Sequence, residues 1–565
     1  MSDGGEEALP VPRDLEPGAR RQEAADARPW ILRRLDLERP DLLLMGAFLV
    51  VAFAFRFFSP LMPDIFARPF QSAPVSNCVT NTPVDAQGHL GTLCGLAYPY
   101  QPNTAKAPLP PSPAEGEVFD EIYFADFAHD DLTGVSYFDP EPPLAKEVIA
   151  AGEWLDGAYR GIFQGAQGSF ADLGFNTVGW RIMVCIFGTL CVPLMYLLAL
   201  QLWRERWFAV AAATFVAFDG MFFVQSRIGM IDIIPIFFIM LAYTLFLIHL
   251  KARSRIDSLV TLVLTGVVLG LAVASKWIAL AALASIIFFL VMRPLARHLA
   301  VSLGGGDRPW RWGFLKGPGL PGGAEPEVYW PTAVIALVAI PVAIYLVSWL
   351  PFFFMSGPYQ FHSLGDIVNY NYQAYEYHAH LKATHPFGST WFSWPFLYRP
   401  VLYYYQYQGL GTDAVSGRPL VAGIVDLGNP VIWWAGIAAV LSLPYFVLRH
   451  RSFPAAVILV GFVTQYLPWS RVSRVIFLYH FFGGLLFLLL ALAFVLTWMQ
   501  RAGPLRIELF GERFELSTRW VVPAFCALAV VSFLFFYPLW TGTPISDTSY
   551  LGGFPLGKTW LQTWI

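Results

Sequence analysis

The chain has 565 residues, of which 56% are hydrophobic and only 14% are charged, and its mean hydropathy is +0.52. This composition excludes an ordinary soluble protein, because many apolar runs are long enough to cross a bilayer. The net charge of −3 leaves no broad basic surface for nucleic acid. We therefore expect an all-α, polytopic integral membrane protein.

Residues 1–40 are polar and show no periodicity, so we expect a disordered or surface-lying cytosolic tail. A cleaved signal peptide is not expected, because the apolar run 42–58 continues to Pro60 without a small-residue cleavage pattern. This run is the first predicted transmembrane helix. Ten more runs bring the expected number to about eleven within a transmembrane domain of residues 41–541, at about 178–203, 207–225, 228–250, 258–275, 277–295, 331–354, 429–448, 453–469, 474–499 and 519–540.

The distribution of Lys and Arg supports this threading. Positive charges gather in alternate connections, which assigns those connections to the cytosolic side. The N-terminus is then inside, and the odd number of crossings places the C-terminal tail, residues 542–565, outside the cytoplasm.

Two predicted outer loops are too long to be simple connectors. The first, 59–177, is rich in Asp and Glu, and the second, 355–428, is rich in aromatic residues, His and Pro. Long ordered loops usually carry function. Cys78 and Cys94 fall in the first loop and could pair in an oxidising compartment or remain free. The other three cysteines lie in apolar runs, where a buried thiol is expected.

The first outer loop contains an acidic pair, Asp120 and Glu121, at the start of a short segment with apolar periodicity. Such a pair often does no more than complement the dipole of a helix N-terminus. It can also supply a catalytic carboxylate, and we choose this alternative because of the basic residues that the threading places on the same side.

Those basic residues lie at or just inside the predicted outer ends of the spans. A cation at the bilayer centre costs roughly 2.5–3.5 kcal/mol on insertion scales. Any one of them could instead reach out to lipid phosphates. As a set they favour a site for an anionic, membrane-embedded ligand, and they are Arg181, Arg227, Lys276, Arg399, Arg471 and Arg474.

A collinear series of motifs resembles the protein O-mannosyltransferases. Each motif alone is weak, but the series extends in order over about residues 42–541. It comprises Phe119-Asp120-Glu121, Tyr137 to Lys146, Ser226 to Asp232, Ser275-Lys276-Trp277, His385-Pro386, Trp391 to Pro395, Arg399-Pro400, Gly428-Asn429-Pro430, Leu467-Pro468-Trp469, Arg474 and Phe477 to His480.

The resemblance implies a membrane glycosyltransferase of the GT-C type. Such an enzyme transfers mannose, with inversion, from a polyprenyl-phosphate-mannose donor to Ser or Thr hydroxyls of secreted or membrane proteins, here at the outer face of a bacterial cell membrane. The family pattern assigns the general base to Asp120, with Glu121 beside it, and assigns basic residues to the lipid phosphate. No metal or other cofactor is expected, and no cluster with metal-ligand spacing contradicts this.

Among the basic residues, Arg181 and Lys276 are the first candidates for the donor phosphate, because they lie on different spans at the same predicted depth. Arg227 and Arg474 are further candidates. Cations held in place there would stabilise the negative charge that develops on the departing phosphate.

The second outer loop supplies candidates for contacts with substrate, namely His385, Trp391, Trp394 and Arg399. An aromatic belt at the membrane interface accounts for the aromatic residues equally well. A structural hydrogen bond remains an alternative role for the histidine.

The chain departs from the family pattern in two places. Glu141 and Ala145 stand where the family usually has His and Gly, and residues 69–117 resemble an insertion before the acidic pair. The role of the loop around Glu141 is therefore open, and the insertion could alter the choice of acceptor. No appended carbohydrate-binding β domain is visible.

Two alternatives remain. A related polyprenyl-phosphate glycosyltransferase could use the same scaffold with another sugar or with a lipid or glycan acceptor. A transporter would more naturally show inverted repeats with ionisable residues near the midplane, whereas here we detect no repeat and the charges gather at one face. Association with translocation machinery is left open by the sequence.

Overall fold

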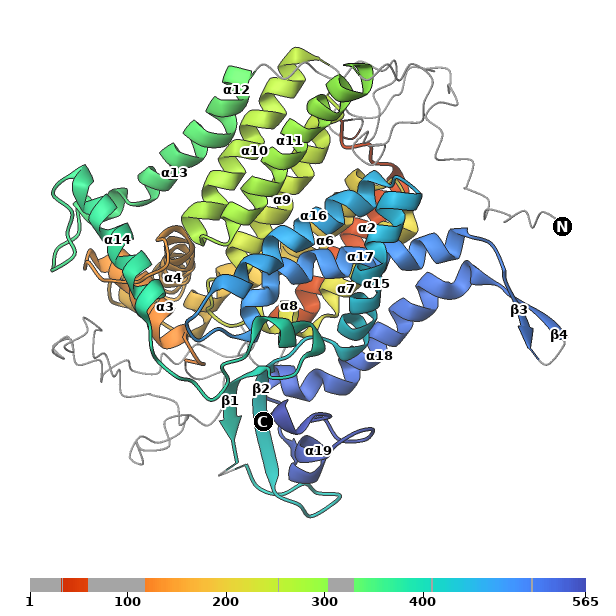
Figure 1. The fold of residues 1–565 in the computed structure, drawn as a ribbon. Coiled ribbons are helices and arrows are strands. Elements are labelled where there is room, and N and C mark those ends of the chain that lie inside the picture. The colour runs from red at the N-terminus through yellow and green to blue at the C-terminus, as the bar shows by residue number, and fades with distance from the viewer. Residues whose placement is uncertain are drawn as a thin grey trace.

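The computed structural model describes residues 32, 34–58, 117–252, 254–302, 330–407, 410–509 and 512–564, and it is predominantly helical (Figure 1). The predicted insertion 69–117 and both loop cysteines lie outside or almost entirely outside this part of the chain. Cys185 and Cys191 are buried and Cys526 is half-buried, and all three are free, as expected for thiols in apolar runs.

Eight described helical segments are long and apolar enough to cross a membrane. They are Arg39–Phe57 (α2), Thr177–Leu202 (α6), Arg255–Ser275 (α10), Trp330–Ser348 (which includes α12, Trp330–Val334, and α13, Ile340–Ser348), Pro430–Arg449 (α15), Phe453–Arg471 (which begins with α16, Phe453–Tyr466), Leu478–Arg501 (which includes α17, Phe482–Arg501) and Thr518–Thr541 (which includes α18, Val521–Thr541).

Three shorter apolar helices occupy the remaining predicted positions. They are Arg206–Ala217 (α7), Ile233–His249 (α9) and Ala279–Leu295, the last forming most of α11, Ala279–Ser302. The short helix α8, Gly220–Gln225, follows α7. The eleven predicted runs are thus all helical in the described residues, while the number that crosses the bilayer stays a prediction.

Several helices begin where the sequence supplies a cap. The Asn176 side chain accepts hydrogen bonds from the backbone N–H groups of Val178 and Gly179, at 3.0 and 3.3 Å, and so starts α6. Asn429 caps α15 in the same way and is followed by Pro430, whose fixed φ suits the first helical position.

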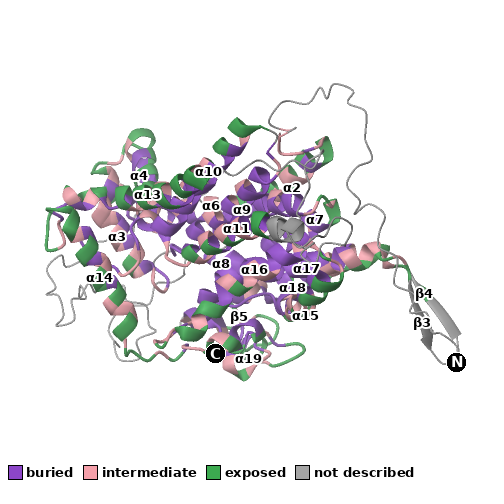
Figure 2. Cartoon of the chain, turned by 45° about the horizontal axis from the view of Figure 1, so that its top comes forward, coloured by how far each residue is buried: buried purple, intermediate pink, exposed green. Residues whose placement is uncertain are grey.

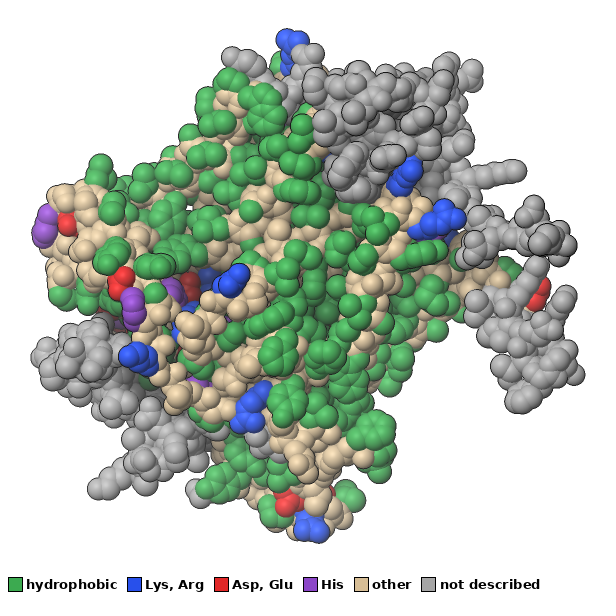
Figure 3. Space-filling view, in the orientation of Figure 1, with side chains coloured by type: hydrophobic (Ala, Val, Ile, Leu, Met, Phe, Trp, Pro, Cys, Tyr) green, Lys and Arg blue, Asp and Glu red, His purple; other side chains and the backbone are tan. Residues whose placement is uncertain are grey.

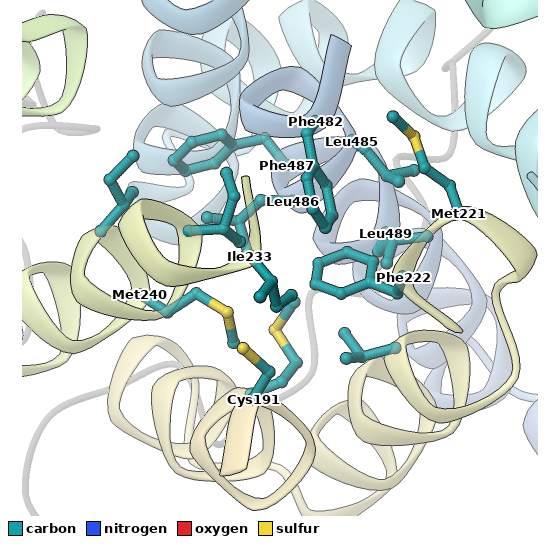
Figure 4. Close-up of a cluster of buried hydrophobic side chains, with 14 of the residues drawn as sticks. Cys191, Met221, Phe222, Ile233, Met240, Phe482, Leu485, Leu486, Phe487 and Leu489 are labelled. Atoms are coloured by element: carbon teal, nitrogen blue, oxygen red, sulfur yellow. The ribbon is translucent and has the colours of Figure 1, made fainter. Parts of the chain in front are cut away.

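The centre of the bundle is built from α6 to α9 and α17, where most side chains are buried (Figure 2). Phe222 and Phe482 meet edge to face at 4.6 Å between ring centroids. Figure 4 shows Ile233, Met240 and Phe487 converging with them into one apolar cluster. Because lipid is as apolar as these side chains, the cluster stabilises the bundle mainly through close van der Waals packing.

The first outer loop contains three helices rather than an irregular chain: α3 (Glu121–Thr133), α4 (Leu144–Phe163) and α5 (Phe170–Gly174). Helix α5 packs closely on α4, because a Cβ at Gly174 would lie 1.7 Å from the carbonyl oxygen of Glu153. We call α3 to α5 the outer unit.

The second outer loop forms helix α14 (Leu364–His380) and two antiparallel strands, β1 (Val401–Gln406) and β2 (Leu420–Asp426). The C-terminal tail adds a third strand, β5 (Ile545–Ser546), followed by the short helix α19 (Asp547–Leu551). A separate hairpin of β3 (Leu505–Leu509) and β4 (Glu512–Leu516) precedes α18. The all-α prediction thus omitted two small sheets, because these segments lie in connections where local periodicity is weak.

The segments predicted to be outer gather at one end of the bundle. The backbone N–H of Asp139 in the first loop donates to the Tyr370 hydroxyl in the second, at 2.8 Å. In the tail, the Trp564 indole donates to the carbonyl of Leu397 at 2.6 Å. Figure 1 shows α3, α4 and α14 on one side and β1, β2 and α19 below them.

The segments predicted to be inner meet at the opposite end. Arg34 pairs with Asp257 at 2.8 Å, and Arg501 pairs with Glu205. Hydrophobic side chains cover much of the visible surface between the ends (Figure 3). The grouping agrees with the charge distribution, and which end faces outward stays a prediction.

Candidate active site

The turn before α3 holds the acidic pair in an unusual backbone. Phe119 has φ +56°, in the left-handed region that costs an L-residue roughly 1–2 kcal/mol. Its ring stacks on that of Tyr403 in β1, with centroids 4.3 Å apart and planes 21° apart. Such a pair contributes about 0.5–1.5 kcal/mol beyond its buried area. The stack is therefore of the right size to offset the strain.

Asp120 follows this turn and precedes the first residue of α3. It is half-buried, and among the described residues none donates a hydrogen bond to its carboxylate. The pKa of Asp120 is raised to about 7, chiefly by burial; the carboxylates of Asp232 and Asp139 contribute to the rise, and Lys276 opposes it. A carboxylate with this pKa is available to exchange a proton near neutral pH.

Glu121 has a different environment from its neighbour. Its side chain is 0% exposed, and the Arg181 guanidinium grips it through Nε to Oε1 at 2.7 Å and Nη2 to Oε2 at 2.5 Å. The backbone N–H of Val118 donates to Oε2 at 2.6 Å, and that of Gly229 donates to Oε1. This carboxylate therefore ties together the turn, α6 and the segment after α8.

Arg181, predicted to hold the donor phosphate, is thus engaged with Glu121 and is itself 0% exposed. A buried, two-pronged pair of this kind is a rigid support. Through this pair, Arg181 of α6 contacts Glu121, the first residue of α3.

Lys276 directly follows the last residue of α10, Ser275. Its Nζ lies 2.8 Å from Asp232 Oδ1 and 3.7 Å from Glu141 Oε1. Glu141, which stands where the resembled family usually has His, thus adds negative charge beside this lysine. The loop that carries it is held by Lys146, which donates to the carbonyls of Glu141 and Pro142 at 2.7 and 3.0 Å and also pairs with Asp139.

Arg474 lines a cavity of about 410 Å³ whose other lining residues are Leu381, Lys382, Ala383, Thr384, His385, Ser473 and Val475. His378 lies nearby at the end of α14, in ring contact with Trp277 at 6.0 Å. Burial, together with the charges of Arg474 and Lys276, lowers the pKa of His378 to about 4, so its ring is neutral at physiological pH. The site thus keeps its positive charge on the lysine and the arginine.

Arg227 lies elsewhere in the bundle. Its guanidinium stands over the ring of Phe223 at 4.6 Å, and its three nitrogens are buried without a hydrogen-bond partner among the described residues. Arg56 of α2 is buried as well and donates to the Ser226 hydroxyl at 2.8 Å. No described contact joins Arg227 to Asp120 or Lys276.

The candidate substrate residues of the second loop form two groups, His385 with Arg399 and Trp391 with Trp394. His385 lines the cavity with Arg474, and its Nδ1 accepts the backbone N–H of Phe387 at 3.2 Å. Arg399 Nε donates to the carbonyl of Pro386 at 2.6 Å and so supports that segment.

The two tryptophans pack against protein. Trp394 is only 1% exposed, stacks near His480 and donates its indole N–H to Ser389 Oγ at 2.9 Å. Trp391 is half-buried, and its carbonyl accepts the hydroxyl of Tyr466 at 2.9 Å. The contacts of Trp394 are those of a core residue.

Sequence reasoning did not select Asp232 or His378 as site residues, and it named Tyr403 only among the aromatic residues of the second outer loop that could stack on sugar or peptide. Asp232 stood within a motif of the series, which was a usable signal. Tyr403 was one of many tyrosines in an aromatic-rich loop, and only the fold distinguishes it by the stack on Phe119. Among the described residues, no group of three or more His, Cys, Asp or Glu could hold a metal ion.

Comparison with known proteins adds to this geometry. The family model described as dolichyl-phosphate-mannose-protein mannosyltransferase matches residues 114–354. The model for the C-terminal four-transmembrane region of protein O-mannosyltransferase matches residues 363–564. Together the two models span most of the chain.

Similar proteins include two bacterial polyprenol-phosphate-mannose–protein mannosyltransferases. The one from Mycolicibacterium smegmatis is 25% identical over 507 residues, covering 80% of this chain and 89% of the relative. The one from Corynebacterium glutamicum is 26% identical over 493 residues, covering 77% and 86%. The Saccharomyces cerevisiae Pmt1–Pmt2 complex bound to its sugar donor matches in fold, with TM-score 0.62 and 15% identity over 95% of this chain and 94% of that one.

Proposed function

The chain belongs to the protein O-mannosyltransferase family, and from this premise we propose that it transfers mannose from polyprenyl-phosphate-mannose to Ser or Thr hydroxyls of proteins. The proposal for the site rests on the properties of one residue, Asp120. It is the carboxylate of the acidic pair that no described residue binds, and its pKa of about 7 suits a general base.

In the proposed step, Asp120 removes the proton from the acceptor hydroxyl as its oxygen attacks C1 of mannose. The bond between C1 and the phosphate oxygen breaks, and its electron pair leaves with the polyprenyl phosphate. Attack from the face opposite the phosphate inverts the configuration at C1. Removal of the proton by a positioned carboxylate contributes roughly 10²- to 10⁴-fold.

The departing phosphate gains one negative charge, because a phosphodiester becomes a monoester. Lys276 and Arg474 are the proposed partners of this group, since both lie at the Asp120 end of the bundle and both influence the ionisation of His378. Asp232 and Glu141 hold Lys276 in position before the donor arrives. A preorganised cation stabilises the developing charge without the cost of reorganisation.

Glu121 and Arg181 act in this proposal as one support for the start of α3. Their mutual hydrogen bonds occupy the carboxylate and the guanidinium, so neither is assigned to the phosphate. Arg227 is left out of the phosphate site, because its described contact is with Phe223.

The cavity between His385 and Arg474 is the proposed approach for the acceptor peptide. In this proposal the reaction takes place at the outer face of a bacterial cell membrane; the Lys and Arg distribution supports the outer face, and the similarity to bacterial relatives supports the bacterial membrane. It needs no metal, because Asp120 supplies the base and the two cations meet the phosphate. Addition of a chelator to the purified enzyme should leave its rate unchanged.

The direct test is transfer by the purified protein in lipid nanodiscs, with labelled polyprenyl-phosphate-mannose and a Ser/Thr-rich peptide. Asp120→Asn keeps the size of the side chain but cannot accept the proton, so we expect transfer to be abolished while donor binding is retained. Asp126→Asn is the matched control, since it makes the same change within α3, the helix that Asp120 precedes, at a group whose pKa is also raised to about 7 by burial.

A transfer rate in Asp120→Asn close to that of the parent would remove Asp120 as the base. Parallel reactions with other polyprenyl-phosphate sugars and with lipid or glycan acceptors test the substrate assignment. Faster transfer in one of those reactions would replace mannose or the peptide in the proposal.

A further inference from the structure

Tyr403 occupies an irregular position in its strand. The pairing of β1 with β2 joins Leu402 to Val425 and then Tyr404 to Ile424, so Tyr403 is the extra residue of a β-bulge. A bulge turns one side chain away from the regular alternation, and bulges are frequent beside active sites. Here the bulge directs the ring of Tyr403 onto Phe119.

The hydroxyl of Tyr403 is held from two sides. It accepts a hydrogen bond from Gln225 Nε2 at 2.7 Å and donates to Asp426 Oδ2 at 3.2 Å. Gln225 Nε2 also reaches the same carboxylate oxygen at 3.3 Å, which closes a triangle. Gln225 and Asp426 are 0% exposed and Tyr403 is 3% exposed, so water does not compete for these bonds.

The three residues come from separate parts of the chain. Gln225 ends α8, Tyr403 lies in β1, and Asp426 ends β2. The triangle therefore fixes one ring relative to both the membrane bundle and the small sheet. Burial raises the pKa of Asp426 well above its usual range, whereas the hydrogen bonds from Gln225 and Tyr403 lower it.

The ring fixed in this way lies against the residue that orients the base. The backbone of Phe119 lies in the left-handed region, at φ +56°. A residue keeps such a strained conformation only where the surrounding structure holds it. Asp120 is the next residue, so rotation at Phe119 would move the carboxylate. Arg181 holds Glu121, the residue after Asp120, by hydrogen bonds. Tyr403 holds Phe119, the residue before Asp120, by the stacked rings.

We propose that Gln225, Tyr403 and Asp426 form a positioning triad that sets the orientation of Asp120 through the ring of Phe119. The proposal rests on the assignment of Asp120 as the general base. No described hydrogen bond joins the triad to the Asp120 carboxylate, so the triad acts on it through the turn. A misplacement of about 1 Å can cost on the order of a hundredfold in rate, so this support has kinetic consequences.

Tyr403→Leu tests the triad, because it removes both the stacked ring and the hydroxyl. We expect kcat for peptide mannosylation to fall at least about tenfold, with the KM for the donor changed less than about twofold. The pH at which the rate reaches half its maximum should also move from its parent value, because the surroundings of Asp120 change. Tyr403→Phe keeps the stacked ring but loses the hydrogen bonds that fix it, so it should recover only part of the rate and should still shift the pH profile.

Tyr404→Leu is the matched control. Tyr404 is the next residue of the same strand, is also 3% exposed and hydrogen-bonds Gln406 instead of the triad. It should lower the melting temperature about as much as Tyr403→Leu while kcat per folded enzyme and the pH profile stay unchanged. If Tyr403→Leu fails to fold, Tyr403→Phe and Asp426→Asn serve in its place, and each should shift the pH profile.

Equal kcat losses in the two leucine variants, or an unchanged pH profile in all triad variants, would overturn the proposal. An inactive parent protein, or a parent rate that survives Asp120→Asn, would instead overturn the proposed function. The two failures are therefore distinguishable in one set of assays.

Discussion

The outer unit and the centre of the membrane bundle differ in the kind of side chain that they bury. In the bundle, α6 to α9 and α17 bury a nearly continuous apolar cluster. In the outer unit, α3 and α4 bury carboxylates, among them Glu121 and Glu153, and α4 exposes Trp154, Ile162 and Phe163. Burying a charge costs several kcal/mol of folding free energy unless the charge is paired. The buried carboxylates therefore lower the stability of the outer unit, which is where the reactive carboxylate lies.

Loss of the Glu121–Arg181 pair should produce the largest decrease in the free energy of unfolding. Glu121→Gln leaves the Arg181 charge buried without its counter-charge, and we expect a loss of about 3–5 kcal/mol in the stability of the folded protein. Thermal unfolding in nanodiscs measures this. The double variant Glu121→Gln with Arg181→Met should recover part of the loss, and no recovery would show that the pair does not act as a unit.

Phe487→Ala makes the corresponding break in the apolar cluster. The residue is buried beside Tyr243, with ring centroids 5.1 Å apart, and its removal should cost about 3 kcal/mol through lost burial and a cavity. The kcat of the remaining folded enzyme should stay near the parent value. A fall in kcat larger than the fall in folded protein would mean that the two regions are coupled.

The pH dependence of transfer reports on the outer unit directly. Asp120 must be ionised to accept a proton, and its pKa is raised to about 7. With this pKa the ionised fraction falls from about one half at pH 7 to about 1% at pH 5, so the rate should fall roughly fiftyfold over that interval. A rate profile that is flat down to pH 5 would contradict this ionisation.

Lys276→Ala should weaken donor binding about tenfold, because it removes one cation from a phosphate site with high local charge. Binding of labelled donor to the purified variant gives the affinity. Arg501→Ala is the control, since it removes a partly buried cation paired with Glu205 at the opposite end of the bundle. Equal affinities in the two variants would remove Lys276 from the phosphate site.

Glu153→Gln should have the smallest effect, and it should stabilise. Burial and the neighbouring carboxylates raise the pKa of Glu153 well above its usual range. A raised folded-state pKa favours folding below the unfolded pKa of about 4.3, and this stability is lost as pH rises through the folded value. Glutamine avoids the loss, so its melting temperature should exceed that of the parent at pH 8 and equal it near pH 4.

A matched variant, Glu376→Gln, makes the same substitution at a more exposed position of α14. Its difference from the parent should be small at both pH values. A similar gain in both variants at pH 8 would point to net charge instead of the buried cluster.

The apolar runs were predictable from the sequence because a bilayer-spanning helix carries its signal locally. Each of the eleven predicted runs is helical, and the acidic pair does begin a helix. The motif series also indicated the family, since its signal is the order of the motifs along the chain.

The individual roles within the site were decided by tertiary structure. Asp120 and Glu121 are neighbours with the same chemistry in the sequence, yet Arg181, 60 residues away, pairs with one and not the other. The left-handed turn at Phe119, the bulge at Tyr403 and the approach of Glu141 to Lys276 also depend on distant segments. Periodicity and composition determine which segments enter the membrane, whereas the partner of a buried charge depends on which segments the fold brings within hydrogen-bonding distance.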